Sequence, residues 1–287
     1  MDRKKFLKNG LLGLAATASV PALAKPAIST YDKLMAPIGF NHLPNEEERT
    51  GKSVLHRAAT RGHADHGWLD THHSFSFANY RNPERMHFGA LRVLNDDVVA
   101  GGRGFRMHPH DNMEIVSIPL SGGLRHADSM GNEHVIRTND IQVMSAGTGI
   151  RHSEYNQADA EAVRFLQIWL FPRRKGYAPR YDQLTLDPQT LKNRFAQILS
   201  PSKSDDGVWI NQDAWFHLGH FDAGQRTDYT LKGSGTGVYA FVLEGDLRIN
   251  EQALSRRDGY GLWDIDRLQV ETRTAAKVLL MEVPMQL

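Results

Sequence analysis

The sequence predicts an all-β protein made of two tandem antiparallel barrels. Short runs of strand-forming residues recur at regular spacing, and the turns between them carry the glycine, asparagine and aspartate that tight reversals need. The runs lack helical periodicity, which favours a sandwich or barrel. The second half weakly repeats the first, with Gly122–Gly123 and Gly245–Asp246 at corresponding turns. In that half we expect strands at residues 215–221, 237–243, 247–250, 261–264 and 276–283.

Composition limits the classes of function. The 287 residues are 40% hydrophobic, enough for one large core or two medium ones, and carry a formal net charge of +1. No basic stripe with interleaved aromatic residues is present, which argues against a nucleic-acid-binding surface. Cysteine is absent. This excludes disulfides, thiolate zinc sites and iron–sulfur clusters.

Residues 1–24 have the features of an export signal. A basic start is followed by a mildly apolar run at 10–20 and by the small-residue cleavage site Ala22–Leu23–Ala24. The start resembles a twin-arginine signal in which a lysine replaces the second arginine. We therefore expect this chain to use the export machinery as a partner and to be periplasmic. The alternative is that residues 1–24 are an N-terminal extension on a cytoplasmic protein. The apolar run is too short to anchor the chain stably in a membrane.

The rest of the chain is expected to divide into a linker and two barrels. Residues 25–60 are polar and irregular, so we expect a linker in which His42 and His56 are solvated. Residues 61–172 are expected to form a metal-binding barrel. A proline- and glycine-bounded basic turn then begins the second barrel, residues 173–287.

Several histidines of the first barrel are not expected to bind metal. Those of the opening hairpin do not keep one strand face and are interpreted as polar and packing residues. Two others flank a turn and are expected to be exposed. Asn95–Asp97 is expected to break the segment 90–99 into two strands. The histidines concerned are His63, His66, His72 and His73 in the hairpin, and His126 and His134 at the turn.

Two short motifs predict one metal site. Residues two apart on a strand share a face, so His108 pairs with His110 and His152 with Glu154. Glu114 is expected to continue the first of these faces toward the barrel interior. Three imidazoles and a carboxylate suit a divalent metal such as iron, manganese, cobalt, nickel, copper or zinc.

The spacing of these motifs matches the two cupin motifs, and the chain from about residue 55 onward resembles the pirin family of two-barrel cupins. Arg61–Asp70, Phe75–Tyr80 and Leu91–Asp97 add to the resemblance. The resemblance implies two tandem cupin (double-stranded β-helix, or jelly-roll) barrels. It also implies four metal ligands. These are His108, His110, His152 and Glu154.

Many other cupins use the glutamate that corresponds to Glu114 as a ligand. In this chain we expect Glu114 instead to be a nearby carboxylate that orients a ligand or handles a proton. Glu154 is expected to be a ligand, and either glutamate is a candidate to accept a proton during catalysis.

The resemblance further implies a metal-dependent dioxygenase. Its substrates would be O2 and a small aromatic molecule of the quercetin type, whose heterocycle opens with loss of carbon monoxide. Fe(II) is the expected metal. Phe105, Met107 and Met144 are candidates for the wall of the substrate pocket. Two alternatives remain: a non-catalytic, metal-binding redox regulator, and a cupin isomerase or hydrolase acting on a small substrate.

The second barrel is expected to lack the ligands. Aligning Gly122 with Gly245 leaves no His-x-His there. Counting on from the following turns puts Val270 and Thr272 in place of His152 and Glu154.

Overall fold

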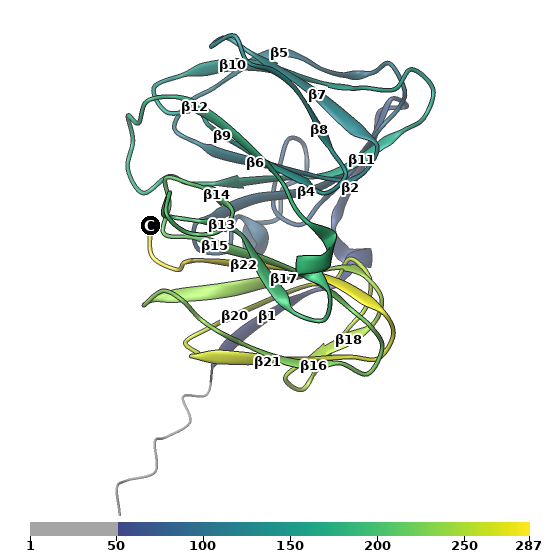
Figure 1. Ribbon diagram of the computed structural model, residues 1–287, viewed down its shortest axis with the longest axis vertical. Helices are drawn as coiled ribbons and strands as arrows, with labels where there is room; N and C mark the ends of the chain where they lie inside the picture. Colours follow the sequence, from purple (N-terminus) through teal and green to yellow (C-terminus); the bar gives the residue numbers. More distant parts are fainter. Residues whose placement is uncertain (1–50) are drawn as a thin grey trace, which may run out of the picture. The chain divides into compact units, whose positions relative to one another are not determined.

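The computed structural model describes residues 51–287. The expected export signal at residues 1–24, and the expected linker up to residue 50, lie outside the described residues. None of the helices in residues 51–287 is long and apolar enough to cross a membrane. These residues form the strands of two barrels, and the expected all-β double-barrel fold is confirmed (Figure 1).

The first barrel has a seven-stranded and a four-stranded sheet. Its strands are β2 (Gly62–Asp65), β3 (Leu69–His73), β4 (Leu91–Val99), β5 (Gly104–His110), β6 (Glu114–Ser121), β7 (Gly123–Asp128), β8 (Glu133–Arg137), β9 (Asp140–Ser145), β10 (Ile150–Asn156), β11 (Val163–Leu170) and β12 (Arg180–Thr185). The large sheet has the order β12-β9-β6-β11-β4-β3-β2 and the small one β5-β10-β7-β8.

The second barrel repeats this plan. Its strands are β1 (Lys52–His56), β13 (Phe195–Ser200), β14 (Val208–Trp209), β15 (Trp215–Phe221), β16 (Arg226–Thr230), β17 (Thr236–Glu244), β18 (Leu247–Ile249), β19 (Gln252–Leu254), β20 (Gly259–Trp263), β21 (Arg267–Thr272) and β22 (Ala276–Pro284). The large sheet has the order β1-β20-β17-β22-β15-β13-β14 and the small one β16-β21-β18-β19. The described residues also include the short 3-10 helices η2 (Ala58–Thr60), η3 (Pro83–Arg85) and η4 (Pro188–Leu191).

Each barrel holds an edge strand from outside its expected range. β1 lies within the expected linker, yet it pairs with β20 of the second barrel (Figure 1). β12 lies within the range expected for the second barrel, yet it pairs with β9 of the first. Sheet pairing therefore does not follow the expected boundaries at residues 60 and 172. Because strand pairing is a long-range event, the local composition of 25–60 and 173–185 did not reveal it.

Two local expectations also change. His56, expected to be solvated, is 5% exposed, and its ring bonds the Tyr239 hydroxyl. Asn95–Asp97 does not interrupt a strand, because β4 runs unbroken through it. Polar residues continue this strand because their side chains find partners: Asn95 bonds His73, and Asp97 accepts from Thr71.

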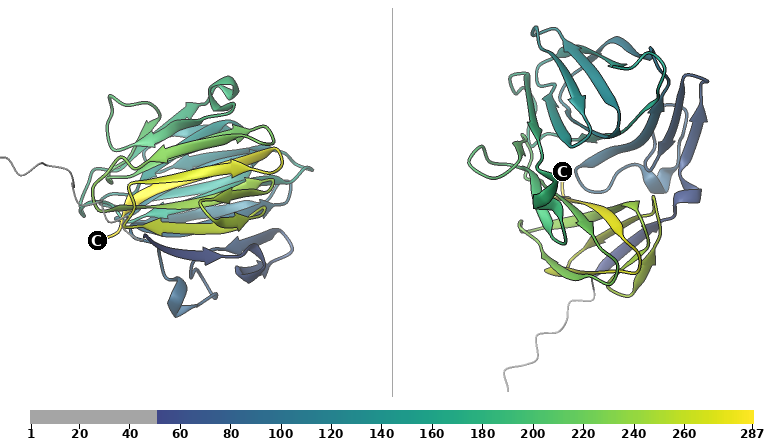
Figure 2. Two further views of the ribbon diagram at one scale, coloured as in Figure 1. Left: turned by 90° about the horizontal axis from the view of Figure 1, so that it is seen from below. Right: turned by 45° about the vertical axis from the view of Figure 1, so that its right-hand side comes forward.

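The two large sheets face each other across a shared apolar core (Figure 2). On β6, the even-numbered Val116 and Ile118 belong to this shared core, whereas Ile115 packs inside the first barrel. The sequence predicts that the even-numbered face of β5 continues through Glu114 along β6 as the interior of the first barrel. This prediction is wrong. The chain leaves the small sheet after His110 and turns at Asn112, whose φ is +46°, before β6 joins the large sheet.

Candidate metal centre

The side chains of the candidate metal centre lie on three neighbouring strands of the small sheet, β5, β10 and β7. β10 lies between β5 and β7. Antiparallel pairing sets His152 opposite His108, and Ile150 opposite His110. A register shift between His152 and Glu154 marks a β-bulge at this point, a common way to aim a side chain at a site.

The three predicted histidines converge. The ring centroid of His108 lies 4.5 Å from that of His152 and 4.8 Å from that of His110, and His110 and His152 are 4.9 Å apart. One nitrogen from each ring lies within 4.8 Å of the other two. One cation can therefore be shared by all three imidazoles.

The electrostatics keep His110 and His152 neutral. Burial, with the neighbouring His152 and His108, lowers the pKa of His110 to about 4. Burial, with His108 and His126, lowers the pKa of His152 to about 3. Both rings thus present lone pairs at neutral pH, which metal binding requires.

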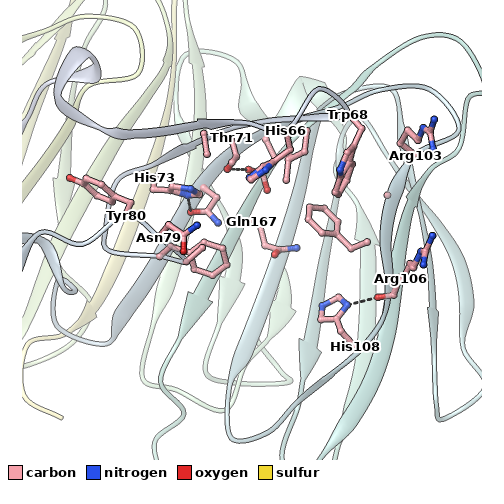
Figure 3. Close-up of a pocket in the computed structure, with 18 of the residues that line it drawn as sticks. His66, Trp68, Thr71, His73, Asn79, Tyr80, Arg103, Arg106, His108 and Gln167 are labelled. Atoms are coloured by element: carbon pink, nitrogen blue, oxygen red, sulfur yellow. Dashed lines mark hydrogen bonds between the residues drawn. The ribbon is translucent and has the colours of Figure 1, made fainter.

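The hydrogen bonding of His108 and His152 leaves nitrogen atoms available to bind a metal. His108 Nδ1 lies 2.7 Å from the Arg106 carbonyl oxygen, which can only accept, so the ring donates there and leaves Nε2 free (Figure 3). His152 is 1% exposed, and neither of its nitrogens has a hydrogen-bond partner among residues 51–287. Such orphaned buried atoms are rare in proteins. A cation beside His152 would satisfy the nitrogen that carries the lone pair.

Glu154 lies two residues after His152 on β10 and is buried. Its carboxylate accepts from Ser117 Oγ at 3.2 Å and from Gln167 Nε2 at 2.7 Å. It forms a second convergent group of possible ligands with His152 and His126, separate from the group that holds His108 and His110. His152 is common to both groups.

Glu114 is not brought to the histidines. It accepts from Ser145 Oγ at 2.7 Å, and from the backbone and side chain of Asn211 at 3.2 and 3.3 Å. Because β6 presents its even-numbered residues to the second barrel, Glu114 joins the barrels. The expectation of a carboxylate beside the metal is wrong for this residue.

His126, expected to be exposed, is 0% exposed. It lies opposite Glu154 in the pairing of β10 with β7, and its Nε2 is 3.1 Å from Asp128 Oδ2. The alternating His-x-Asp of residues 126–128 is the signal in the sequence that could have placed it on an inner face. The expected exposure of His134 is confirmed.

A cavity of about 980 Å³ opens onto the histidines (Figure 3). Its walls combine aromatic rings with polar groups. Trp68 and Phe105 meet edge to face at 5.4 Å, as do Phe77 and Trp169. Phe105 lies in the wall as expected. Met107 and Met144 are not among the lining residues. The lining residues used below are Trp68, Phe77, Asp97, Phe105, Gln167 and Trp169, together with His108 and His110.

Two groups in this cavity were not anticipated. Burial raises the pKa of Asp97 to about 7, against a hydrogen bond from Thr71 that opposes the shift. Trp169 stacks edge-on against His110 at 4.9 Å, and its indole Nε1–H has no partner among residues 51–287. The cavity thus holds a carboxyl that titrates near neutrality and a free donor.

The opening hairpin was expected to hold polar and packing residues. His73 is buried against Asn95. His63, Asp70 and His72 form a third convergent group, which is more exposed than the others, with His63 bonded to Asp70 at 2.8 Å.

Comparison with known proteins identifies the family. The family model described as Pirin matches residues 54–170, and that described as Quercetinase C-terminal cupin domain matches residues 197–283. The chain is 40% identical over 230 residues to a quercetin 2,3-dioxygenase of Escherichia coli, covering 80% of this chain and 98% of the relative. A putative quercetin 2,3-dioxygenase of Pseudomonas aeruginosa is 41% identical over 223 residues, covering 77% and 95%.

A solved structure agrees. The crystal structure of the bacterial pirin YhhW of Escherichia coli in complex with nickel(II) is 38% identical, with a TM-score of 0.77, covering 81% of this chain and 99% of that one. The expected resemblance is confirmed, and the chain belongs to the pirin family of two-barrel cupins.

Proposed function

We propose that this chain is a metal-dependent dioxygenase that opens the heterocycle of quercetin-like flavonols with O2. The observation that carries this proposal is the histidine group opening onto a large aromatic cavity. The names of the relatives support the same chemistry. His108, His110, His152 and Glu154 would hold a divalent cation. When bound, it would supply Lewis acidity toward the flavonol oxygens and redox chemistry with O2.

The residues of this chain would bind and orient the substrate. Trp68 and Phe105 offer edge-to-face rings that suit a flat flavonol. The free indole N–H of Trp169 would donate to a substrate oxygen close to His110.

Asp97 is the carboxyl that we assign to accept the proton of the flavonol hydroxyl. It lines the cavity, and its pKa of about 7 matches transfer near neutral pH. Glu114 lies on the other face of its sheet. Both oxygens of Glu154 already accept hydrogen bonds, which favours its role as a ligand over that of a base.

Oxygen uptake tests the proposal. Protein loaded anaerobically with Fe(II) should consume O2 and release carbon monoxide with quercetin, and should not react with a flavone that lacks the 3-hydroxyl. A chelator should abolish uptake. Fully metallated protein that consumes no O2 with any flavonol would favour the regulatory alternative. Turnover of a small substrate without O2 would favour the isomerase or hydrolase.

Fe(II) is the metal we propose for the cell. Imidazole and carboxylate ligands suit it, although copper binds such sites more tightly and nickel occurs in the structure of the relative. Elemental analysis of protein purified from its own host, followed by activity before and after chelation, decides this point.

We also propose that residues 1–24 direct export to the periplasm through a twin-arginine route. The basic start and the Ala22–Leu23–Ala24 site support it. Mass spectrometry of the periplasmic protein should find Lys25 as the first residue. A chain that keeps Met1 and stays in the cytoplasm would contradict export.

A further inference from the structure

Two histidines of the opening hairpin lie side by side on the large sheet of the first barrel, whereas the metal centre lies on the small sheet. The antiparallel pairing of β2 with β3 sets His63 opposite His72, and Asp65 opposite Asp70. Since alternate residues of a strand share a face, these four side chains lie on one face of the hairpin. Spacing along one strand could not show this, because the two histidines belong to different strands.

Three possible ligand atoms converge on this face. His63 Nε2 lies 2.8 Å from Asp70 Oδ1, and His72 Nδ1 lies 3.7 Å from the same oxygen. The two imidazoles stack, with ring centroids 4.4 Å apart and planes inclined by 21°. A tetrahedral metal with bonds of about 2.0–2.1 Å holds its ligand atoms about 3.3 Å apart. The two distances lie on either side of this value, so small rotations of the side chains would admit one ion.

Hydrogen bonding uses only part of this group. His63 Nε2 donates to Asp70, whose ionised carboxylate can only accept. His72 Nδ1 is too far from the same oxygen for a hydrogen bond. Burial, with the charge of Arg61, lowers the pKa of His72. The ring of His72 is therefore neutral at neutral pH and has a lone pair that Asp70 does not use.

The carboxylates of the hairpin favour a cation here. Asp65 and Asp70 are direct cross-strand partners, and like charges in such positions destabilise a sheet. Arg61 does not neutralise them, because it is paired with Asp96 at 3.3 Å. The side chains of His63, Asp70 and His72 are 53%, 48% and 34% exposed, so an ion can reach them from solvent.

We propose that His63, Asp70 and His72 form a second metal site, which binds Zn(II) with water as the fourth ligand. Two imidazoles and a carboxylate with one open position are a common ligand set for zinc. The ion takes the place of the hydrogen bond between His63 and Asp70, and the His63 ring keeps its proton on Nδ1. This assignment does not depend on flavonol turnover.

The second site should bind its ion more weakly than the main centre. It has three protein ligands, all of them accessible to water. We therefore expect dialysis to remove this ion, so that dialysed protein keeps metal at the main centre only. The weaker site is measured by titration with free zinc.

Zinc at this site would join the edge strand β2 to β3. The turn between these strands carries Trp68, which meets Phe105 in the wall of the cavity. The ion would thus hold the hairpin that supports one side of the cavity. Hydrogen exchange of residues 62–73 should slow when zinc is added.

Calorimetric titration of the metal-stripped chain with Zn(II) gives the first test. We expect two equivalents per chain, the second weaker than the first. In His152→Ala, which damages the main centre, the weaker equivalent should remain. A single equivalent in the wild type, or loss of the weaker one in His152→Ala, would overturn the proposal. The titration needs neither substrate nor O2, so it is independent of the proposed dioxygenase activity.

Variants of the hairpin give the second test. His72→Phe keeps a flat ring for stacking on His63 but removes the nitrogen, so the weaker equivalent should be lost and the tighter one kept. His66→Phe is the matched control, since His66 is an exposed histidine of the same hairpin outside the convergent group. It should keep both equivalents.

The outcomes locate the ion. A weaker equivalent that survives in His72→Phe would place it elsewhere and overturn the assignment. Asp70→Asn keeps the shape of the side chain and removes its charge, so it serves if His72→Phe does not fold, and it should also lose the weaker equivalent. Hydrogen exchange of residues 62–73 should respond to zinc in the wild type and in His66→Phe only. An equal response in His72→Phe would contradict the proposal.

Discussion

The two barrels share one strand plan but differ in what fills them. In the second barrel the interior is a single apolar cluster that includes Tyr229, Ile249, Leu268 and Val270. In the first barrel the apolar interior is divided into two smaller clusters. Along β11, Phe165 belongs to one of these and Trp169 packs against the other, with the polar Gln167 between them.

The strand register shows which residues correspond. Leu124 and Leu247 each follow the glycine turn by two residues, and they pair with Asn156 and Thr272. Counting back along β10 and β21, His152 corresponds to Leu268 and Glu154 to Val270. The sequence-based alignment, which matched Val270 and Thr272 to these ligands, is therefore two residues out. The connection that leads to β21 is shorter by that amount.

The comparison shows that the same arrangement of strands can enclose either an apolar core or a group of metal ligands. Apolar side chains at these positions form a continuous core, which stabilises the second barrel. Imidazoles and a carboxylate at the same positions interrupt the core and leave buried polar atoms that a cation can satisfy. The site therefore weakens the barrel that holds it unless the metal is bound.

The largest expected effect comes from changing the corresponding pair His152 and Leu268. His152→Ala removes the residue common to both ligand groups, and we expect it to bind less than a tenth of the metal of the wild type. Leu268→Ala should keep full metal content but lower the free energy of unfolding by about 2–5 kcal/mol. Elemental analysis and denaturant unfolding measure the two. Metal loss in Leu268→Ala would contradict the assignment of metal binding to the first barrel alone.

Metal removal should act on one barrel more than on the other. Because the first barrel buries the unpaired His152, we expect a chelator to increase amide hydrogen exchange in β10 and β7, with little change in β21 and β18. Hydrogen-exchange mass spectrometry of loaded and stripped protein gives the measurement. Equal changes in both small sheets would contradict it.

Glu114→Gln tests whether this glutamate belongs to the site or to the contact between barrels. A glutamine amide facing the Asn211 N–H groups loses an acceptor, so we expect a loss of about 1–3 kcal/mol in unfolding free energy. Metal content should be unchanged. A variant of wild-type stability that has lost its metal would restore Glu114 to the centre.

Asp97 should give metal-free protein a pH-dependent stability. Its folded pKa of about 7 lies above the ordinary value of 3.8, so the proton is held more tightly in the folded state. The resulting stabilisation is complete below about pH 4 and is lost as the pH rises to about 7. Asp97→Asn should reduce this slope in unfolding experiments between pH 4 and 8. An unchanged slope would mean that Asp97 titrates normally.

The smallest effect is expected from Trp169→Phe. The variant keeps an aromatic ring against His110 but removes the free N–H. Loss of one hydrogen bond of about 1 kcal/mol corresponds to roughly a five-fold rise in KM for quercetin. Steady-state oxygen uptake measures it, with Trp263→Phe in the second barrel as the control. An equal change in both variants would remove the special role of Trp169.

Residue type and spacing were enough to predict the all-β class, the repeat and the histidine group. Alternation along a strand is a local property, so His-x-His and His-x-Glu could be placed on faces from spacing alone. The strands expected in the second half lie close to β15, β17, β18, β20 and β22 for the same reason.

The remaining features depend on how the strands pair in the folded chain. The turn at Asn112 moves the chain from one sheet to another, so the face that holds His110 does not continue to Glu114. The pairing of β7 with β10 buries His126 beside Glu154, although a turn follows close behind it. β1 and β12 join sheets far from them in sequence. Each of these depends on which strand lies next to which, and residue spacing within one strand carries no information about its neighbour.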